Sequence, residues 1–255
     1  MNINSGSLNV LGVKKVGDIF ADEFKAIGFK TTWFEMPETM GRAGHLFCEL
    51  NTGIVKGKKI LLIGHLDTVF EENSLFQMFK RDSMVVYGPG VTDMKGGNII
   101  ILFALKALRD AGVLKNTQII VAYSGDEESV GNPTSISRKD LIDAAKRSDI
   151  ALGFEGATGL NYATVARRSS GSWRLETSGL RAHSAGVFTE NVGAGAIYEM
   201  ARILNSFYTE LPEQNLTFNT ATIVGGTLVD FDETQSKGSS FGKNNIVPPK
   251  AISNG

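Results

Sequence analysis

Short apolar runs alternate with longer amphipathic stretches from the start of the chain to about Thr164. Apolar and β-branched runs bounded by polar or glycine-rich turns are typical of strands, whereas apolar residues at helical spacing predict helices. The longest such stretch, residues 95–111, is apolar almost throughout and predicts a helix buried on most sides. We expect strands at residues 45–50, 59–63, 117–123 and 150–154, and further helices at 18–27 and 141–147.

The pattern changes after Arg167, where a second segment begins. It predicts a strand, an amphipathic helix and two further strands, at residues 172–177, 192–208, 216–224 and 245–247. This order is an unfinished split βαβ unit, from which a final helix and strand are lacking. In the first segment, strands that alternate with helices favour an open, mostly parallel α/β sheet. We therefore predict two domains: residues 1–166 with that α/β sheet, and residues 167–255 with an incomplete, ferredoxin-like α+β fold.

Composition narrows the classes of function. Lys and Arg number 26 and Asp and Glu 27, so the net charge of −1 leaves no basic surplus for a nucleic acid partner. The longest apolar run, residues 99–108, contains Lys106 and is shorter than the ~20 residues of a membrane span, so we expect no membrane partner. Cys48 is the only cysteine, which leaves oxygen and imidazole groups to hold any metal. The first residues lack a secretory signal, but a chain from which the signal has been removed would lack it too. The sequence therefore leaves both a cytoplasmic and a periplasmic or secreted location open.

Side chains that can ligate a metal follow three of the predicted strands and precede the longest helix. These residues are His65, Asp67, Asp93, Glu127, Glu128 and Glu155. In an open α/β sheet the carboxyl ends of the strands line one crevice, so we expect these loops to meet there. One histidine with several carboxylates and no thiolate suits zinc, or less often cobalt or manganese, and carboxylates can bridge two ions. Two such ions roughly 3.5–4 Å apart would polarise an amide carbonyl and activate water.

The positions of these residues indicate a role for each. His65 would ligate through one ring nitrogen, and Asp67, two residues later, would orient the ligands instead of binding metal. Asp93, in a glycine-rich loop, is our candidate for the carboxylate that bridges two ions. We assign Glu127 as general base and Glu128 as ligand, because adjacent residues of one turn can face the water and the metal respectively. Glu155 would complete the ligands of the second ion.

Three strings of residues resemble the signature of a known family. They are His-Leu-Asp-Thr-Val at 65–69, Gly-Pro-Gly-Val-Thr-Asp-Met-Lys-Gly-Gly at 88–97 and Gly-Asp-Glu-Glu at 125–128. In this order they are similar to the di-zinc family of carboxypeptidase G, acetylornithine deacetylase and succinyl-diaminopimelate desuccinylase, and the resemblance extends from about Asn4 to Ala251. It implies the same roles for the matching residues. Tyr-Gly-Pro-Gly at 87–90, with a phenylalanine after the first string, is closer to the glutamate carboxypeptidase branch.

The resemblance also implies a role for the second segment, as a lid that joins two subunits into a homodimer. His183, in Arg-Ala-His-Ser-Ala-Gly, matches a lid histidine that reaches the active site of a neighbouring subunit and stabilises the oxyanion. Asn245 matches a lid asparagine near the substrate. Both residues are therefore expected to act in the reaction, although they lie far along the chain from the predicted ligands.

The chain also departs from the family. The family needs a second histidine ligand late in its sequence and, after it, an arginine that binds the carboxylate of the substrate. This chain has three histidines, of which His45 begins a predicted strand and His183 lies in the lid, so neither replaces that ligand. A helix before Asn2 is also expected from the family. The resemblance therefore predicts a truncated chain with an incomplete second metal shell and little or no activity.

Taken singly, these residues have plain structural explanations, such as a hydrogen-bonded histidine after a strand or acidic residues in a solvated turn. The glycines at 88–97 fit neither a P-loop nor a dinucleotide-binding loop. Our leading hypothesis is a zinc-dependent carboxypeptidase that hydrolyses the amide bond next to a C-terminal, glutamate-like residue in small peptides or N-acyl amino acids. The alternatives are an N-acyl-amino-acid deacylase or dipeptidase of the same family, and a catalytically inactive metal-binding dimerisation module.

Overall fold

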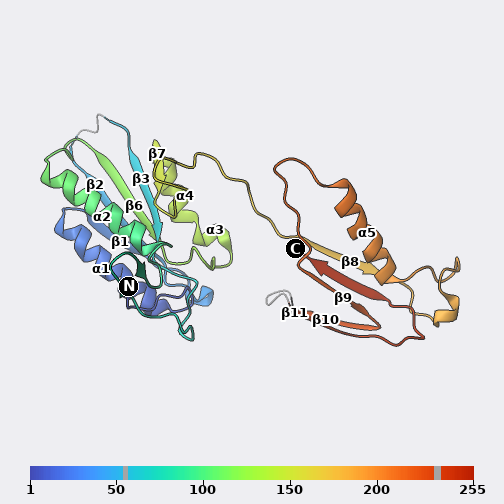
Figure 1. Cartoon of the computed structure of the whole chain (residues 1–255). Helices are drawn as coiled ribbons and strands as arrows, with labels where there is room; N and C mark the ends of the chain where they lie inside the picture. Colours follow the sequence, from blue (N-terminus) through green and yellow to red (C-terminus); the bar gives the residue numbers. More distant parts are fainter. Residues whose placement is uncertain (54–56, 233–236) are drawn as a thin grey trace. The chain divides into compact units, whose positions relative to one another are not determined.

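The structure of the chain, a computed structural model, describes residues 1–53, 57–232 and 237–255. It divides into two compact units, Met1–Thr164 and Val165–Gly255 (Figure 1). Each unit has its own sheet and its own buried cluster of apolar side chains. Within the described ranges, no helix combines the length and the apolar character needed to cross a membrane.

The sheet of the first unit is mixed. Its five strands lie in the order β1-β2-β6-β3-β7, with β1 at Lys30–Phe34, β2 at His45–Asn51, β3 at Ile60–His65, β6 at Gln118–Ser124 and β7 at Ile150–Gly153. β3 pairs in parallel with β6 and β7, whereas β2 pairs antiparallel with β1 and β6. The predicted mostly parallel sheet is therefore wrong, because half of the strand pairings are antiparallel.

The antiparallel pairings have a local cause. The sequence does not predict β1, because this partly exposed edge strand carries only two large apolar residues, Trp33 and Phe34. Residues 35–44, which include the short 3-10 helix η1 (Glu38–Met40), form too short a connection for two parallel strands, so β2 folds back beside β1. The hydrophobic pattern thus identifies a strand without specifying its direction.

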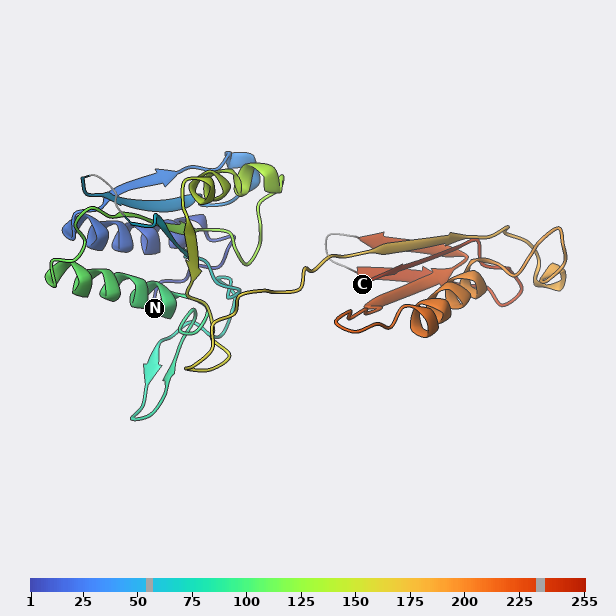
Figure 2. The same cartoon turned by 90° about the horizontal axis from the view of Figure 1, so that it is seen from above.

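Helices cover both faces of this sheet (Figure 2). The helices α1 (Val10–Ala26) and α2 (Lys95–Asp110) pack on one face and enclose the main core, which includes Phe24, Leu46, Ile101, Val121 and Tyr123. The short helix α3 (Thr134–Ser137) leads into α4 (Lys139–Lys146), which covers the other face above Phe47, Leu61, Ile120, Ala122 and Ala144. Successive side chains of β2 and β6 therefore point alternately into the two cores on opposite faces of the sheet, as expected along a strand.

Two helices differ from their predicted form. α1 begins at Val10, well before the predicted start at residue 18, and the side chain of Asn9 caps it by accepting a hydrogen bond from the Gly12 amide. Glycine interrupts the helical pattern at Gly17, where a Cβ would lie 2.4 Å from the Trp33 ring. α2 is buried on one face instead of most sides, since Phe103 is 61% exposed on its outer face.

A small hairpin, β4 (Lys80–Arg81) and β5 (Val86–Tyr87), lies between β3 and α2 in the chain. The second unit has an antiparallel sheet in the order β8-β12-β9 and a separate β10-β11 hairpin. Its elements are β8 (Arg174–Ser178), the 3-10 helix η2 (Ser184–Gly186), α5 (Ala196–Glu210), β9 (Thr222–Gly226), β10 (Leu228–Asp232), β11 (Lys237–Phe241) and β12 (Lys250–Asn254). α5 packs on the sheet through a small apolar cluster of Ala196, Met200 and Ala251.

The third strand of this sheet, β12, inserts between the first two, which is the arrangement of a split βαβ unit. The strand predicted at residues 245–247 is wrong, because that segment contributes only an isolated bridge between Ile246 and His183. The strand predicted at 216–224 begins only at Thr222. The β10-β11 hairpin was not predicted, since β11 is mostly polar and contains Gly238, and it forms by pairing with β10.

Gly97 tests the packing of α2 on the sheet. A Cβ at this position would lie 2.0 Å from the carbonyl oxygen of Phe154. We expect Gly97→Ala to lower the free energy of unfolding by about 1–3 kcal/mol, because backbone atoms must move apart. Gly153→Ala is the control, since a Cβ there meets no atom within 4 Å, and its effect should stay within about 0.5 kcal/mol. Urea unfolding followed by circular dichroism measures both, and equal stabilities would contradict this packing.

Candidate metal centre

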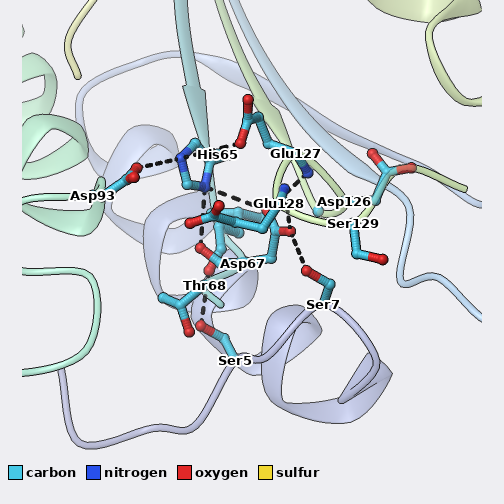
Figure 3. Close-up of polar contacts among 12 residues, drawn as sticks. Ser5, Ser7, His65, Asp67, Thr68, Asp93, Asp126, Glu127, Glu128 and Ser129 are labelled. Atoms are coloured by element: carbon cyan, nitrogen blue, oxygen red, sulfur yellow. Dashed lines mark hydrogen bonds and ion pairs between the residues drawn. The ribbon is translucent and has the colours of Figure 1, made fainter. Parts of the chain in front are cut away.

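His65, Asp93 and Glu128 converge at the carboxyl ends of β3 and β6 (Figure 3). His65 is the last residue of β3 and pairs with Ser124 at the end of β6, so the loop after β6 begins beside it. Asp93 lies just before α2. One ligand atom from each of the three residues lies within 4.8 Å of the others, and His65 Nε2 is 2.9 Å from Asp93 Oδ1. Three of the predicted ligands therefore form one group.

The donor atoms of this group fit a zinc ion. An imidazole with carboxylates and no thiolate is a donor set that suits zinc, cobalt or manganese. Only 1% of the His65 side chain is exposed, whereas 60% of the Asp93 side chain faces solvent. Glu128 is intermediate in burial. The group is thus anchored in the protein on one side and open on the other, where water or a substrate can approach.

Asp67 connects the parts of this group without belonging to it. Its carboxylate is fully buried and accepts hydrogen bonds from the Ser7 hydroxyl at 2.6 Å and from the amides of Glu127 and Glu128, both at 3.0 Å. Burial alone would raise the pKa of Asp67, but the hydrogen bonds from His65 and Ser7 hold it below its ordinary value. Asp67 is therefore a charged acceptor that fixes the loop bearing the two glutamates.

The ring of His65 is oriented by the same residue. Its Nδ1 lies 3.0 Å from the carbonyl oxygen of Asp67, which leaves Nε2 to face Asp93. Burial disfavours the charged ring, but the hydrogen bonds of Asp67 and Asp93 and the charge of Glu127 together raise the pKa of His65 to about 9. Without a metal the ring is thus protonated at neutral pH and donates from both nitrogens. With a metal, Nε2 is the nitrogen placed to ligate.

Glu127 lies beside the ligands and not among them. Its Oε2 is 4.0 Å from His65 Nε2, and 48% of its side chain is exposed. Partial burial raises the pKa of Glu127, and the charges of neighbouring carboxylates, with Glu155 the foremost, add to this shift against the charge of His65. Burial and then the charge of Asp93 raise the pKa of Glu128 likewise. A carboxylate with a raised pKa is a better proton acceptor, as a general base requires.

Glu155 lies in the same unit but outside the group of three. Its side chain is exposed, and its charge reaches Glu127, whose pKa it helps to raise. The structure therefore brings Glu155 into the electrostatic surroundings of the centre. Its predicted role as a ligand of a second ion stays a prediction.

His183 and Asn245 lie together in the second unit. The amide of Ser184 donates to the carbonyl oxygen of Asn245 at 2.9 Å, and His183 forms a bridge with Ile246. His183 Nδ1 accepts a hydrogen bond from the Ala185 amide at 3.1 Å, so Nε2 is the ring nitrogen left to meet another molecule. Both predicted residues are exposed. Their roles in the reaction stay predictions.

Two residues of the centre were missed in the sequence. Ser7 hydrogen-bonds Asp67 from the start of the chain, and no spacing or motif links the two. Asn98 is fully buried and donates to the carbonyl oxygen of His65 at 2.6 Å, while the Tyr123 hydroxyl donates to the carbonyl of Asn98. An amide side chain within an apolar helix needs a buried hydrogen-bond partner. The sequence could therefore have indicated a structural role for Asn98, whereas nothing in it indicated one for Ser7.

Residues 61–219, more than half of the chain, match the profile of peptidase family M20/M25/M40. The chain belongs to this family. The resemblance predicted from three short strings is thereby confirmed.

The matches to curated relatives cover a larger share of this chain than of the relatives. Carboxypeptidase G2 of Pseudomonas sp. (strain RS-16) is 30% identical over 236 residues, which are 86% of this chain and 52% of the relative. A probable succinyl-diaminopimelate desuccinylase of Staphylococcus aureus (strain MRSA252) is 28% identical over 173 residues, 64% of this chain and 40% of the relative. The chain thus spans about half the length of the curated relatives that it matches.

Solved structures share the fold. A tripeptidase from Staphylococcus aureus subsp. aureus Mu50 aligns with a TM-score of 0.68 at 18% identity, over 99% of this chain and 62% of that one. The aminopeptidase PepT from Bacillus cereus ATCC 10987 aligns with a TM-score of 0.62 at 16% identity, over 100% and 67% of the two chains. The mixed α/β fold of this M20/M25/M40 member is therefore that of known peptidases.

The pKa of His65 predicts how metal binding depends on pH. Below a pKa of about 9 the metal-free ring carries a proton that must leave before Nε2 can ligate. We therefore expect the affinity for Zn²⁺ to rise with pH, about tenfold per unit while one proton is displaced, and to level off above that pKa. Calorimetric titration between about pH 7 and 9 measures this slope. His183→Ala is the control and should leave it unchanged, whereas an affinity independent of pH in the unaltered protein would contradict the assignment of His65.

Proposed function

We propose that the protein is a zinc-dependent carboxypeptidase that hydrolyses the amide bond next to a C-terminal, glutamate-like amino acid. The observation that carries this proposal is the group of His65, Asp93 and Glu128 with the carboxylate of Glu127 beside it. A metal site with an adjacent carboxylate that is not a ligand has the parts needed for hydrolysis of an amide. The 30% identity to carboxypeptidase G2 supports the class of substrate.

The proposed centre holds two zinc ions, for which cobalt or manganese can substitute. His65, Asp93 and Glu128 would hold the first, and Asp93 and Glu155 would contribute to the second. Zinc bound there would polarise the scissile carbonyl and make water acidic enough to react at neutral pH. Every ligand in this set is an oxygen or an imidazole nitrogen, which agrees with a chain whose single cysteine, Cys48, is buried in the core.

In the proposed reaction Glu127 moves the proton. It accepts a proton from the attacking water, whose oxygen bonds to the carbonyl carbon, and it then delivers that proton to the amide nitrogen as the C–N bond breaks. The products are a carboxylic acid and the free amine of the C-terminal amino acid. The raised pKa of Glu127 suits both transfers, because the group must take up and release a proton within one turnover.

The second unit has a part in the same proposal. It would form the contact between two copies of the chain, and His183 of a second copy would donate from Nε2 to the oxyanion, with Asn245 near the substrate. What supports this is local: the two residues lie side by side, and His183 Nε2 is not used by the intrachain hydrogen bond of the ring. The protein would then act as a homodimer.

A cavity beside the centre indicates which acyl groups fit. It has a volume of about 360 Å³ and is lined by Asp93 and Glu128 together with Val69, Phe70, Phe76, Val86, Tyr87 and Val91. Among the described residues that line it there is no lysine or arginine. An apolar or aromatic acyl group matches these walls, whereas none of these side chains could form an ion pair with the distal carboxylate of a succinyl group. The cavity therefore favours a carboxypeptidase over a desuccinylase.

Glu127→Gln tests the role of the base. In the full-length protein we expect turnover of an N-acyl-glutamate to fall by at least about 100-fold, because the amide cannot accept the proton, while the zinc content stays near that of the unaltered protein. Glu128→Gln is the matched variant, and it should lower the zinc content itself. Metal analysis and a hydrolysis assay on the same preparations separate the two effects. Unchanged turnover in Glu127→Gln would reject the assignment, and zinc bound by the full-length protein without any turnover would favour a non-catalytic metal-binding module.

Phe76→Ala tests the acyl cavity. We expect kcat/KM for N-benzoyl-glutamate to fall roughly tenfold, as the loss of an apolar contact of this size implies, with little change for N-acetyl-glutamate. Phe103→Ala removes an exposed ring from the outer face of α2 and is the control. Faster hydrolysis of N-succinyl than of N-benzoyl substrates would favour a deacylase of the desuccinylase type instead.

A further inference from the structure

A second buried polar cluster lies on the other side of the loop that bears Glu127 and Glu128. It consists of His45, Asp126, Ser137 and Arg138, none of which belongs to the metal-binding group. Asp126 is fully buried, and His45 is 2% exposed. A buried carboxylate is costly unless its oxygens are satisfied, so the partners of Asp126 must be held in place.

Asp126 is bound at both its carboxylate oxygens and its main chain. Arg138 donates to Oδ1 at 2.5 Å and to the carbonyl oxygen of Asp126 at 3.1 Å. The hydroxyl of Ser137 and the amide of Gly131 donate to Oδ2 at 2.6 and 2.8 Å. These bonds fix the position of Asp126, which directly precedes Glu127, relative to the far end of its own loop and to the start of α4.

His45 binds the loop at its first residue. Its Nδ1 accepts a hydrogen bond from the Gly125 amide at 3.2 Å, and its Nε2 therefore carries the proton and donates to the carbonyl oxygen of Ser137 at 2.7 Å. Arg42 completes the restraint by donating to the carbonyl and hydroxyl oxygens of Ser129 at 2.6 and 2.8 Å. Residues 125–131 are thus held on this side, while Asp67 binds the amides of Glu127 and Glu128 on the other.

We propose that His45, Asp126 and Arg138 are positioning residues for Glu127 and Glu128. They act through the backbone of residues 125–131 and do not touch the ligands. A metal ligand and a base must be held within about 0.5 Å of their working positions, and a loop that starts and ends in glycine, at Gly125 and Gly131, has little stiffness of its own. The inference rests on the proposed metal centre.

A purely structural reading assigns the cluster to attaching α3 and α4 to the sheet. The two hydrogen bonds of His45 separate these readings, because one goes to the loop at Gly125 and the other to Ser137 of α3. In His45→Asn, the amide oxygen can replace Nδ1 and keep the bond to Gly125. In His45→Gln, the amide nitrogen can replace Nε2 and keep the bond to Ser137.

The closing experiment measures the affinity for Co²⁺ by absorbance titration against a competing chelator, in the unaltered protein and in both variants. If the cluster positions the loop, His45→Gln should bind Co²⁺ roughly tenfold more weakly, and His45→Asn should stay within about threefold of the unaltered protein on the same scale. Equal affinities in all three proteins, or a loss confined to His45→Asn, would overturn the proposal. Failure of the unaltered protein to bind Co²⁺ would instead overturn the metal centre itself.

Arg138→Lys gives a second measurement, which applies even if a variant of His45 does not fold. Lysine keeps the charge opposite Asp126 but cannot reach both the carboxylate and the carbonyl oxygen, so Co²⁺ affinity should again fall roughly tenfold. Arg147→Lys is the matched control, since Arg147 makes a similar pair with Glu49 at an exposed position. An unchanged affinity in Arg138→Lys, with a melting temperature close to that of the control, would contradict the positioning role.

Discussion

The buried carboxylate of Asp67 is the constraint on which the metal centre depends. It can remain charged in the interior only because Ser7, the amides of Glu127 and Glu128, and His65 satisfy it. These partners come from the start of the chain, the end of β3 and the loop after β6. An unpaired buried carboxylate would raise the free energy of the folded state. The need to satisfy Asp67 therefore holds three distant segments of the chain together. The same contacts set the spacing of the groups that would bind metal.

The charges around His65 explain why this site is suited to metal binding and proton exchange and not to stabilising the fold. Several carboxylates surround one imidazole, and burial, together with the mutual repulsion of these carboxylates, raises the pKa of Glu127 and of Glu128. A cation among them relieves that repulsion, and without one the proton on His65 does so in part. Carboxylates concentrated beside an open cavity are thus suited to bind a metal and to exchange protons.

Rigidity and access are divided between the two sides of the centre. On the protein side, residues 125–131 lie between Asp67 and the cluster around Asp126, and every bond in that region ends on a buried or partly buried partner. On the other side, Asp93 is largely exposed and adjoins an apolar cavity. A site of this kind fixes the position of its own groups and leaves space for a substrate. The short β4-β5 hairpin contributes Val86 and Tyr87 to the lining of that cavity.

The sequence by itself indicated the family, through three short strings, and predicted which side chains lie together, because loops that follow strands of one sheet meet at its edge whatever their separation in the chain. His65, Asp93 and Glu128 were found in this way. Tertiary structure alone decided the direction of β2, the strand at β12 in place of residues 245–247, and the supporting contacts of Ser7, His45 and Arg138. A hydrophobic pattern records which side of a segment is buried. It does not record which segment lies opposite, and the direction of a strand or the partner of a buried polar group depends on that neighbour.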